Sequence, residues 1–275
     1  MDLYGCHFEY AGTPSRMYGL IIATVNTTKY TSLSGQIESY SFFNKKEKKK
    51  YHLGDSFDNS AMTFDAEVVS RSNIDRTEQR AIEKWLFHQA DFCKLYVDMK
   101  DDIYAETYEF VDGKQKRIYL NCRFVNPEKI ENSGGLVGYR FTVECDSCMA
   151  WQDAVTYEYK LDSTSEFSNS IISVNVDSDL NDYVYPKVTI QIGDVGGDII
   201  ISNNTDDASR LTSFVSLTPN VTLVMRGNGI NYISGDNYLK FKDKNFIRLL
   251  DGENQIAIVG DVVGLSFEFQ NRRFL

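Results

Sequence analysis

The sequence predicts a mainly β protein with one helix, divided into two domains. Aromatic residues favour strands, and the chain has 17 Tyr and 17 Phe among 275 residues. Alternation of apolar and polar residues, the pattern of half-buried antiparallel strands, recurs in both halves. One amphipathic helix is predicted in the first half, and none is predicted after residue 150. These observations predict a mixed first domain over residues 1–148 and an all-β second domain over residues 149–275.

The strands of the first domain are predicted from period-two runs. The clearest runs place apolar side chains on one face at residues 62–68, 118–124 and 139–145. Asp112-Gly113 lies between two such runs, so residues 104–124 are predicted to form a hairpin. Each of these strands would bury one face and leave the other face in water.

The helix is predicted over about residues 75–89. Asn73 or Asp75 can cap its first turn, and Glu78 completes a capping-box pattern with Asp75. The apolar stripe that follows at helical spacing comprises Ile82, Trp85 and Leu86. Because this stripe needs a partner, the helix must lie against a sheet, and Trp85 is predicted to fill the core.

The second half contains only strand-like patterns. Runs of alternating apolar residues are found at 172–176, 188–192, 221–225, 256–258 and 265–269. Turn-forming clusters separate the runs at 193–197, 203–207, 227–229 and 251–254. Short strands at this spacing predict a two-sheet sandwich or jelly roll.

Charge and hydropathy narrow the class of function. The formal net charge is −10, which argues against a nucleic-acid-binding surface, because such a surface requires clustered Lys and Arg. No apolar run approaches the roughly 20 residues that span a bilayer. The start, Met1-Asp2-Leu3, lacks the apolar stretch of a signal peptide. We therefore predict no specific nucleic-acid binding, no membrane insertion, and synthesis in the cytoplasm without a signal peptide.

Motifs for catalysis and cofactor binding are missing from the sequence. The three histidines lack metal-ligand spacing, and there is no GxSxG elbow, no P-loop and no complete dinucleotide loop. Cys145 and Cys148 have the spacing of half a zinc site, but no second CxxC or HxxxH completes it. The five cysteines are therefore predicted to be ordinary thiols. The sequence predicts no catalytic residues, no metal and no cofactor.

Two features remain open from the residues alone. The lysine-rich run at 45–50 lies between Phe42-Phe43 and Tyr51. It is either a solvated hairpin tip or an arm that docks on an acidic neighbouring subunit or partner. Trp151 either fills a core or, if exposed, stacks on a sugar ring, which makes it a candidate sugar-stacking residue.

The order of several motifs points to a known family. In the first half, the motifs are found at residues 8–10, 18–22, 82–86, 94–97 and 141–147. In the second half, they are found at residues 185–188, 202–205 and 250–256. Taken in this order, they resemble the distal tail (Dit) proteins of long-tailed, siphovirus-like phages, and the resemblance covers almost the whole chain.

The resemblance implies a structural phage tail protein and not an enzyme. Members of this family form a hexameric ring from the first domain, which joins the distal end of the tail tube to the tail-tip hub. DNA passes through this ring at infection. The second domain is implied to be a galectin-like sandwich that offers a platform for receptor-binding proteins. The implied partners are further copies of the chain, the major tail tube protein, the tail-associated hub protein and receptor-binding proteins, all at the distal tip of the virion's tail.

Ring closure requires that one patch of a subunit meets a different patch on the next subunit. An extended arm can supply one of these patches, and we predict that the arm around Phe42, Phe43 and Tyr51 belongs to the subunit contact. The alternative function is a carbohydrate-binding adhesin that recognises the host-cell surface through the second domain. A glycan-cleaving enzyme ranks below both, because the sequence nominates no pair of catalytic carboxylates.

Overall fold

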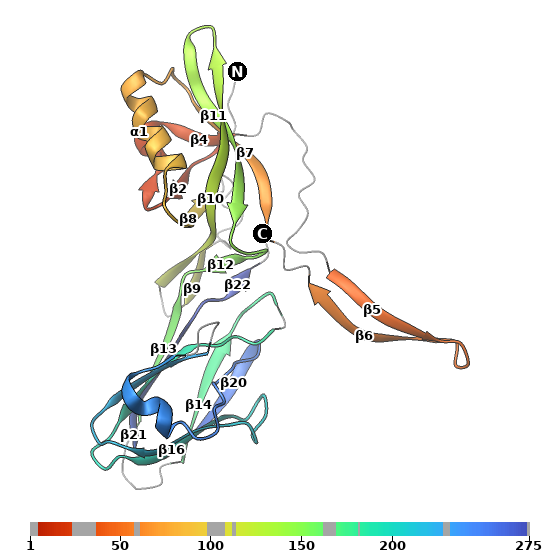
Figure 1. Ribbon diagram of the computed structural model, residues 1–275, viewed down its shortest axis with the longest axis vertical. Helices are drawn as coiled ribbons and strands as arrows, with labels where there is room; N and C mark the ends of the chain where they lie inside the picture. The colour runs from red at the N-terminus through yellow and green to blue at the C-terminus, as the bar shows by residue number, and fades with distance from the viewer. Residues whose placement is uncertain are drawn as a thin grey trace. The chain divides into compact units, whose positions relative to one another are not determined.

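The computed structural model describes residues 5–23, 37–57, 61–97, 108–111, 114–161, 169–180, 182–227 and 232–273 (Figure 1). The chain divides into two compact units. Unit 1 comprises Met1–Gln152 and Arg273–Leu275, and unit 2 comprises Asp153–Arg272. The prediction of a mainly β protein is confirmed.

Most described strands of unit 1 belong to one sheet. The order along its main path is β1-β4-β7-β11-β10-β8-β2-β3. Beside this path, β9 and β12 each pair with β10, and β22 pairs with β12. The strands are β1 (Gly5–Cys6), β2 (Phe8–Tyr10), β3 (Thr13–Pro14), β4 (Leu20–Ala23), β7 (Thr63–Ser70), β8 (Cys93–Val97), β9 (Tyr108–Val111), β10 (Lys114–Asn132), β11 (Gly135–Cys145), β12 (Ala150–Gln152) and β22 (Arg272–Arg273). A short 3-10 helix, η1 (Ser15–Tyr18), leads into β4.

The period-two runs of the first half are strands of this sheet. Apart from Met62, which precedes β7, the predicted runs at 62–68, 118–124 and 139–145 lie in β7, β10 and β11, and β11 pairs antiparallel with the other two strands. β9 pairs antiparallel with the start of β10, as the predicted hairpin requires. The Asp112-Gly113 turn itself lies outside the described residues.

The helix α1 (Arg76–Phe87) begins one residue later and ends two residues earlier than predicted, with Asp75 as its N-cap. The Asp75 carboxylate accepts hydrogen bonds from the backbone N–H groups of Thr77 and Glu78, at 2.7 and 2.8 Å. In return, Glu78 accepts one from the Asp75 N–H at 3.3 Å, which completes the capping box. At the other end, the Gln89 side chain donates to the Trp85 carbonyl at 2.7 Å, in place of a further helical turn.

The apolar stripe of α1 packs into the core of unit 1, as predicted. Trp85 stacks on Phe8 and Tyr18, with ring centroids 5.7 and 5.2 Å apart. Its indole N–H donates to the Tyr10 carbonyl at 2.8 Å, so the one polar atom of the side chain is satisfied. Ile82 and Leu86 are fully buried beside it. The stripe therefore anchors α1 to β2 and the adjoining strands.

Unit 2 is the predicted two-sheet sandwich. The order of one sheet is β13-β21-β15-β18-β19, and that of the other is β14-β20-β16-β17. The strands are β13 (Val155–Lys160), β14 (Asn169–Val176), β15 (Lys187–Ile192), β16 (Gly197–Asn203), β17 (Leu211–Leu217), β18 (Thr222–Arg226), β19 (Tyr232–Ile233), β20 (Gly252–Val259) and β21 (Val262–Phe269). Their inward-facing side chains form one apolar core that includes Ile190, Ile201, Phe214 and Phe267.

One expectation for the second half was wrong, because a short 3-10 helix, η3 (Gly235–Lys240), follows β19. Six residues are too few to display a helical period, so the sequence pattern could not reveal it. No helix in the described part of the chain is long and apolar enough to cross a membrane.

A buried amide network fixes the turns at one end of the sandwich. Asn254 is fully buried, and its side chain donates to the carbonyls of Leu250 and Gly252, at 2.7 and 2.9 Å. Its oxygen accepts from the Leu250 N–H and from the Asn203 side chain, both at 2.8 Å. The Asn203 oxygen in turn accepts from the Thr205 N–H at 3.1 Å. Every polar atom of the Asn254 side chain is therefore satisfied.

We expect Asn254→Ala to destabilise unit 2 by about 1–3 kcal/mol, because it leaves partly buried backbone groups of Leu250 and Gly252 without their side-chain partner. Chemical denaturation of the full chain measures the change. Asn175→Ala is the matched control, since Asn175 is exposed on β14, and a change within about 0.5 kcal/mol is expected there. Equal effects of the two substitutions would contradict the role assigned to the network.

Candidate assembly interface

Strands β5 (Ile37–Asn44) and β6 (Lys49–Phe57) form a ribbon that is a separate two-stranded sheet; we call it the arm. Among the described strands, β5 and β6 pair only with each other. The turn at 45–48 is closed by Asn44, whose side chain accepts from the Lys46 N–H at 3.0 Å, and Lys48 adopts a φ of 50°. A two-stranded ribbon is at best marginally stable alone in water.

The arm brings together the three predicted contact residues. Phe42 and Phe43 are 57% and 54% exposed, and Tyr51 is 39% exposed. Phe42 lies directly opposite Tyr51, whereas Phe43 lies opposite Lys50. Because neighbouring residues of a strand point to opposite faces, both faces of the arm carry an aromatic ring. Exposed apolar groups clustered in this way mark protein interaction surfaces.

The lysine-rich run occupies the tip of the arm. Residues 45–50 comprise five lysines and one glutamate, and all of them are exposed. The Tyr51 hydroxyl donates to the Glu47 carboxylate. The Lys49 ammonium lies 5.1 Å from the centroid of the Tyr51 ring, in cation–π contact. The tip therefore presents concentrated positive charge next to the aromatic rings.

Trp151, the candidate sugar-stacking residue, lies outside the arm. It is half-buried in β12, opposite Tyr119 of β10, and so belongs to unit 1 and not to the sandwich. The predicted boundary at residue 148 assigned it to the second domain, because pairing between β12 and β10 has no local signal in the sequence. Its role in stacking on a sugar stays a prediction, and the adhesin alternative has no candidate residue in unit 2.

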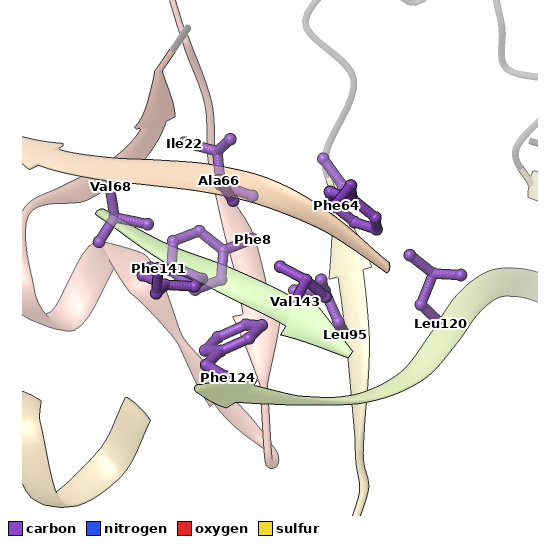
Figure 2. Close-up of a pocket in the computed structure, with 11 residues that line it drawn as sticks. Phe8, Ile22, Phe64, Ala66, Val68, Leu95, Leu120, Phe124, Phe141 and Val143 are labelled. Carbon is purple, nitrogen blue, oxygen red and sulfur yellow. The ribbon is translucent and has the colours of Figure 1, made fainter. Parts of the chain in front are cut away.

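Unit 1 also contains an apolar cavity of about 140 Å³ (Figure 2). Alternate residues of β7 point into it, and strands β2, β4, β8, β10 and β11 supply the rest of its wall. The lining residues are Phe8, Ile22, Phe64, Ala66, Val68, Leu95, Val97, Leu120, Phe124, Phe141 and Val143. Ile22, Phe64, Ala66 and Val97 are only partly buried. The period-two pattern predicts that such residues face inward, but it carries no information about unfilled space between them.

Three cysteine side chains lie in one row across the sheet. Cys122 of β10 is directly opposite Cys93 of β8 on one side and Cys145 of β11 on the other, and all three are free thiols. Burial raises the pKa of Cys145 to about 12 and also raises the pKa of Cys122. In the described part of the chain, no three His, Cys, Asp or Glu side chains gather closely enough to hold a metal ion.

These thiols predict a loss of stability at alkaline pH. Their pKa is higher in the folded state than the usual value of about 8.5, so folding favours the protonated thiols. This stabilisation is complete below the usual thiol pKa of about 8.5 and is lost as the pH rises towards the folded-state pKa of about 12 for Cys145. We expect the Tm of unit 1 to fall between pH 9 and pH 11, and to fall less steeply in Cys145→Ala. Calorimetry across this range tests the prediction, and identical slopes in both proteins would contradict it.

Two family models match the chain along nearly its whole length. The model described as a phage tail protein N-terminal domain matches residues 3–147, and a phage tail C-terminal domain matches residues 149–269. The chain belongs to this phage tail protein family. No curated protein matches its sequence.

Solved structures from phage tails share the fold. The SPP1 Dit protein (gp 19.1), described as a paradigm of the hub adsorption apparatus in phages that infect Gram-positive hosts, aligns with a TM-score of 0.61 at 10% identity, over 98% of this chain and 99% of that one. A chain of the phage P2 baseplate, in its activated conformation with Ca, aligns with a TM-score of 0.50 at 7% identity, over 98% of both chains. A chain of the same baseplate with Sr aligns with the same TM-score of 0.50 and the same 7% identity, over 97% of this chain and 98% of that one. The predicted resemblance to distal tail proteins is thus confirmed for the fold.

Proposed function

We propose that this phage tail protein is a structural component of the tail tip, and that six copies close into a ring between the tail tube and the tail-tip hub. The observation that carries the proposal is the arm, a two-stranded ribbon with exposed aromatic rings on both faces. Such a ribbon gains its stability from a partner surface. A closed ring requires that one patch of each subunit binds a different patch on the next subunit, and the arm can supply one of the two.

The partners follow from this position in the tail. Unit 1 forms the ring and contacts the major tail tube protein and the tail-associated hub protein, and unit 2 offers an outward platform for receptor-binding proteins. The role is one of assembly and not of catalysis, and it requires no cofactor. The net charge of −10 suits a ring through which DNA slides, because like charges suppress adhesion.

The proposal is tested on purified virions. Antibodies raised against unit 2 are expected to label the distal tip of the tail, and quantitative mass spectrometry is expected to count about six copies per virion, as in a ring of six. A label along the tail shaft, or a copy number close to that of the tube protein, would contradict the proposal. Absence of the chain from the virion would contradict it as well.

A further inference from the structure

Cys122 and Cys145 face each other across β10 and β11 at a position that brings opposed side chains close together. The Asp146 N–H donates to the Asn121 carbonyl at 2.9 Å, and the Cys145 N–H donates away from β10, to the Met62 carbonyl at 2.9 Å. These bonds identify Cys122 and Cys145 as a non-hydrogen-bonded pair, in which the opposed Cα atoms lie about 4.5 Å apart. A disulfide requires Cα atoms roughly 4.4–6.8 Å apart, so the spacing of this pair suits one.

Cys93 lies on the other side of Cys122, as its partner on β8. Directly opposed residues share one face of a sheet, so the three thiols lie in line across β8, β10 and β11; we call them the cysteine row. Burial, and then the neighbouring Cys145 and Cys93, raise the pKa of Cys122, as expected when the sulfur atoms are close together.

The cysteine row is accessible at one end. Cys93 is partly exposed, whereas Cys122 and Cys145 are 0% and 3% exposed. A dissolved disulfide can therefore reach Cys93 more readily than the two buried thiols. A thiol reacts with a disulfide by attacking one of its sulfur atoms, through a mixed disulfide. Because each thiol of the row stands next to another, a disulfide formed at Cys93 can pass from sulfur to sulfur into the core.

The life cycle of a phage tail protein supplies the change in redox conditions. Tails are assembled inside the host cell, where low-molecular-weight thiols keep cysteines reduced. The released virion lies outside the cell, where disulfides form and persist. The four cysteines whose side chains the structure describes are free thiols, which is the state expected before release.

We propose that the cysteine row takes up oxidising equivalents from a low-molecular-weight disulfide at Cys93 and ends as a disulfide between Cys122 and Cys145. Cys93 first attacks the external disulfide and releases one reduced thiol. Cys122 then attacks the Cys93 sulfur and releases the second thiol, and Cys145 attacks the Cys122 sulfur and returns Cys93 to a free thiol. The protons lost by Cys122 and Cys145 balance those gained by the two released thiols, so the external disulfide is reduced as the pair is oxidised.

The product joins β10 to β11 inside the core of unit 1. Such a crosslink stabilises a fold mainly by restricting the unfolded chain, so the oxidised protein is expected to melt several degrees above the reduced protein. The chemistry takes place within one copy of the chain, so its test is independent of the proposed ring.

The test treats the folded, reduced full-length chain with oxidised glutathione at about pH 8.5, the ordinary pKa of a thiol. Free thiols are then blocked with iodoacetamide, and the chain is cut with trypsin, which cleaves after Lys and Arg. The three cysteines of the row fall on separate peptides, at residues 85–94, 118–123 and 141–160. Mass spectrometry is expected to find the second peptide joined to the third, and the first peptide without a crosslink.

Single substitutions stop the transfer at different steps. Cys145→Ala is expected to leave a disulfide between Cys93 and Cys122, and Cys122→Ala is expected to leave one glutathione on Cys93. Cys93→Ser is expected to slow formation of the buried disulfide about tenfold or more, because the accessible thiol is gone. Cys148→Ser is the matched control, since Cys148 is also partly exposed but lies outside the row, and it is expected to change neither the product nor its rate.

Circular dichroism confirms that each variant is folded, and Cys122→Val replaces Cys122→Ala if the smaller side chain lowers the Tm. A folded wild-type chain that forms no disulfide between Cys122 and Cys145 would overturn the proposal, as would a disulfide between Cys145 and Cys148 in its place. Oxidation of Cys93→Ser at the wild-type rate would overturn the entry through Cys93. An oxidised chain that melts no higher than the reduced chain would overturn the stabilising effect.

Discussion

Replacing Trp85 with alanine is expected to lower the free energy of unfolding of unit 1 by about 3–5 kcal/mol. The indole is buried between Phe8 and Tyr18, and it is the group that ties α1 to β2 through its hydrogen bond to Tyr10. Its loss leaves a large cavity and removes the hydrogen bond to the Tyr10 carbonyl. Chemical denaturation followed by circular dichroism measures the shift of the unit 1 transition.

Trp85→Phe separates packing from hydrogen bonding. Phenylalanine keeps an aromatic ring against Phe8 but cannot donate to Tyr10, so a loss of about 1–3 kcal/mol is expected, smaller than that of Trp85→Ala. The unit 2 transition should not move in either variant, because Trp85 belongs to the core of unit 1. A loss below about 1 kcal/mol in Trp85→Ala would show that α1 is not anchored in this way.

Replacing residues 37–57 with a short Gly-Ser linker is expected to abolish the proposed ring entirely and to leave the Tm of both units nearly unchanged. The Tm is expected to stay because β5 and β6 pair with each other and with no other described strand, so the eleven-stranded sheet keeps all of its strand pairs. Native mass spectrometry reports the oligomer, and circular dichroism reports the fold.

A matched control for the arm is available in unit 2. Tyr238 and Leu239 are exposed apolar side chains on η3, and their joint replacement with alanine removes exposed apolar surface elsewhere on the chain. The ring is expected to survive this change. Rings that survive the deletion of the arm would show that subunit contact lies outside it.

Much of the fold could be predicted because it is encoded locally. The capping residues Asp75 and Glu78 and the stripe around Trp85 lie within three helical turns, so their spacing alone reveals α1. The alternation in β7, β10 and β11 reveals which faces are buried, and the short strands of the second half reveal the sandwich.

The features that escaped prediction depend on pairing between distant residues. Trp151 belongs to unit 1 because β12 pairs with β10, and no local pattern encodes that choice. The cavity exists because side chains from six strands leave a space between them. The sequence located Phe42, Phe43 and Tyr51 around the lysine run, but it could not show that β5 and β6 pair with no other described strand.

The mass of the purified full-length chain in solution is the most direct test of the account. Native mass spectrometry at micromolar concentration, with negative-stain microscopy of the same sample, is expected to find closed rings with six times the 31.4 kDa mass of the chain. A chain that stays at 31.4 kDa, both alone and when mixed with the tail tube and hub proteins, would contradict the account.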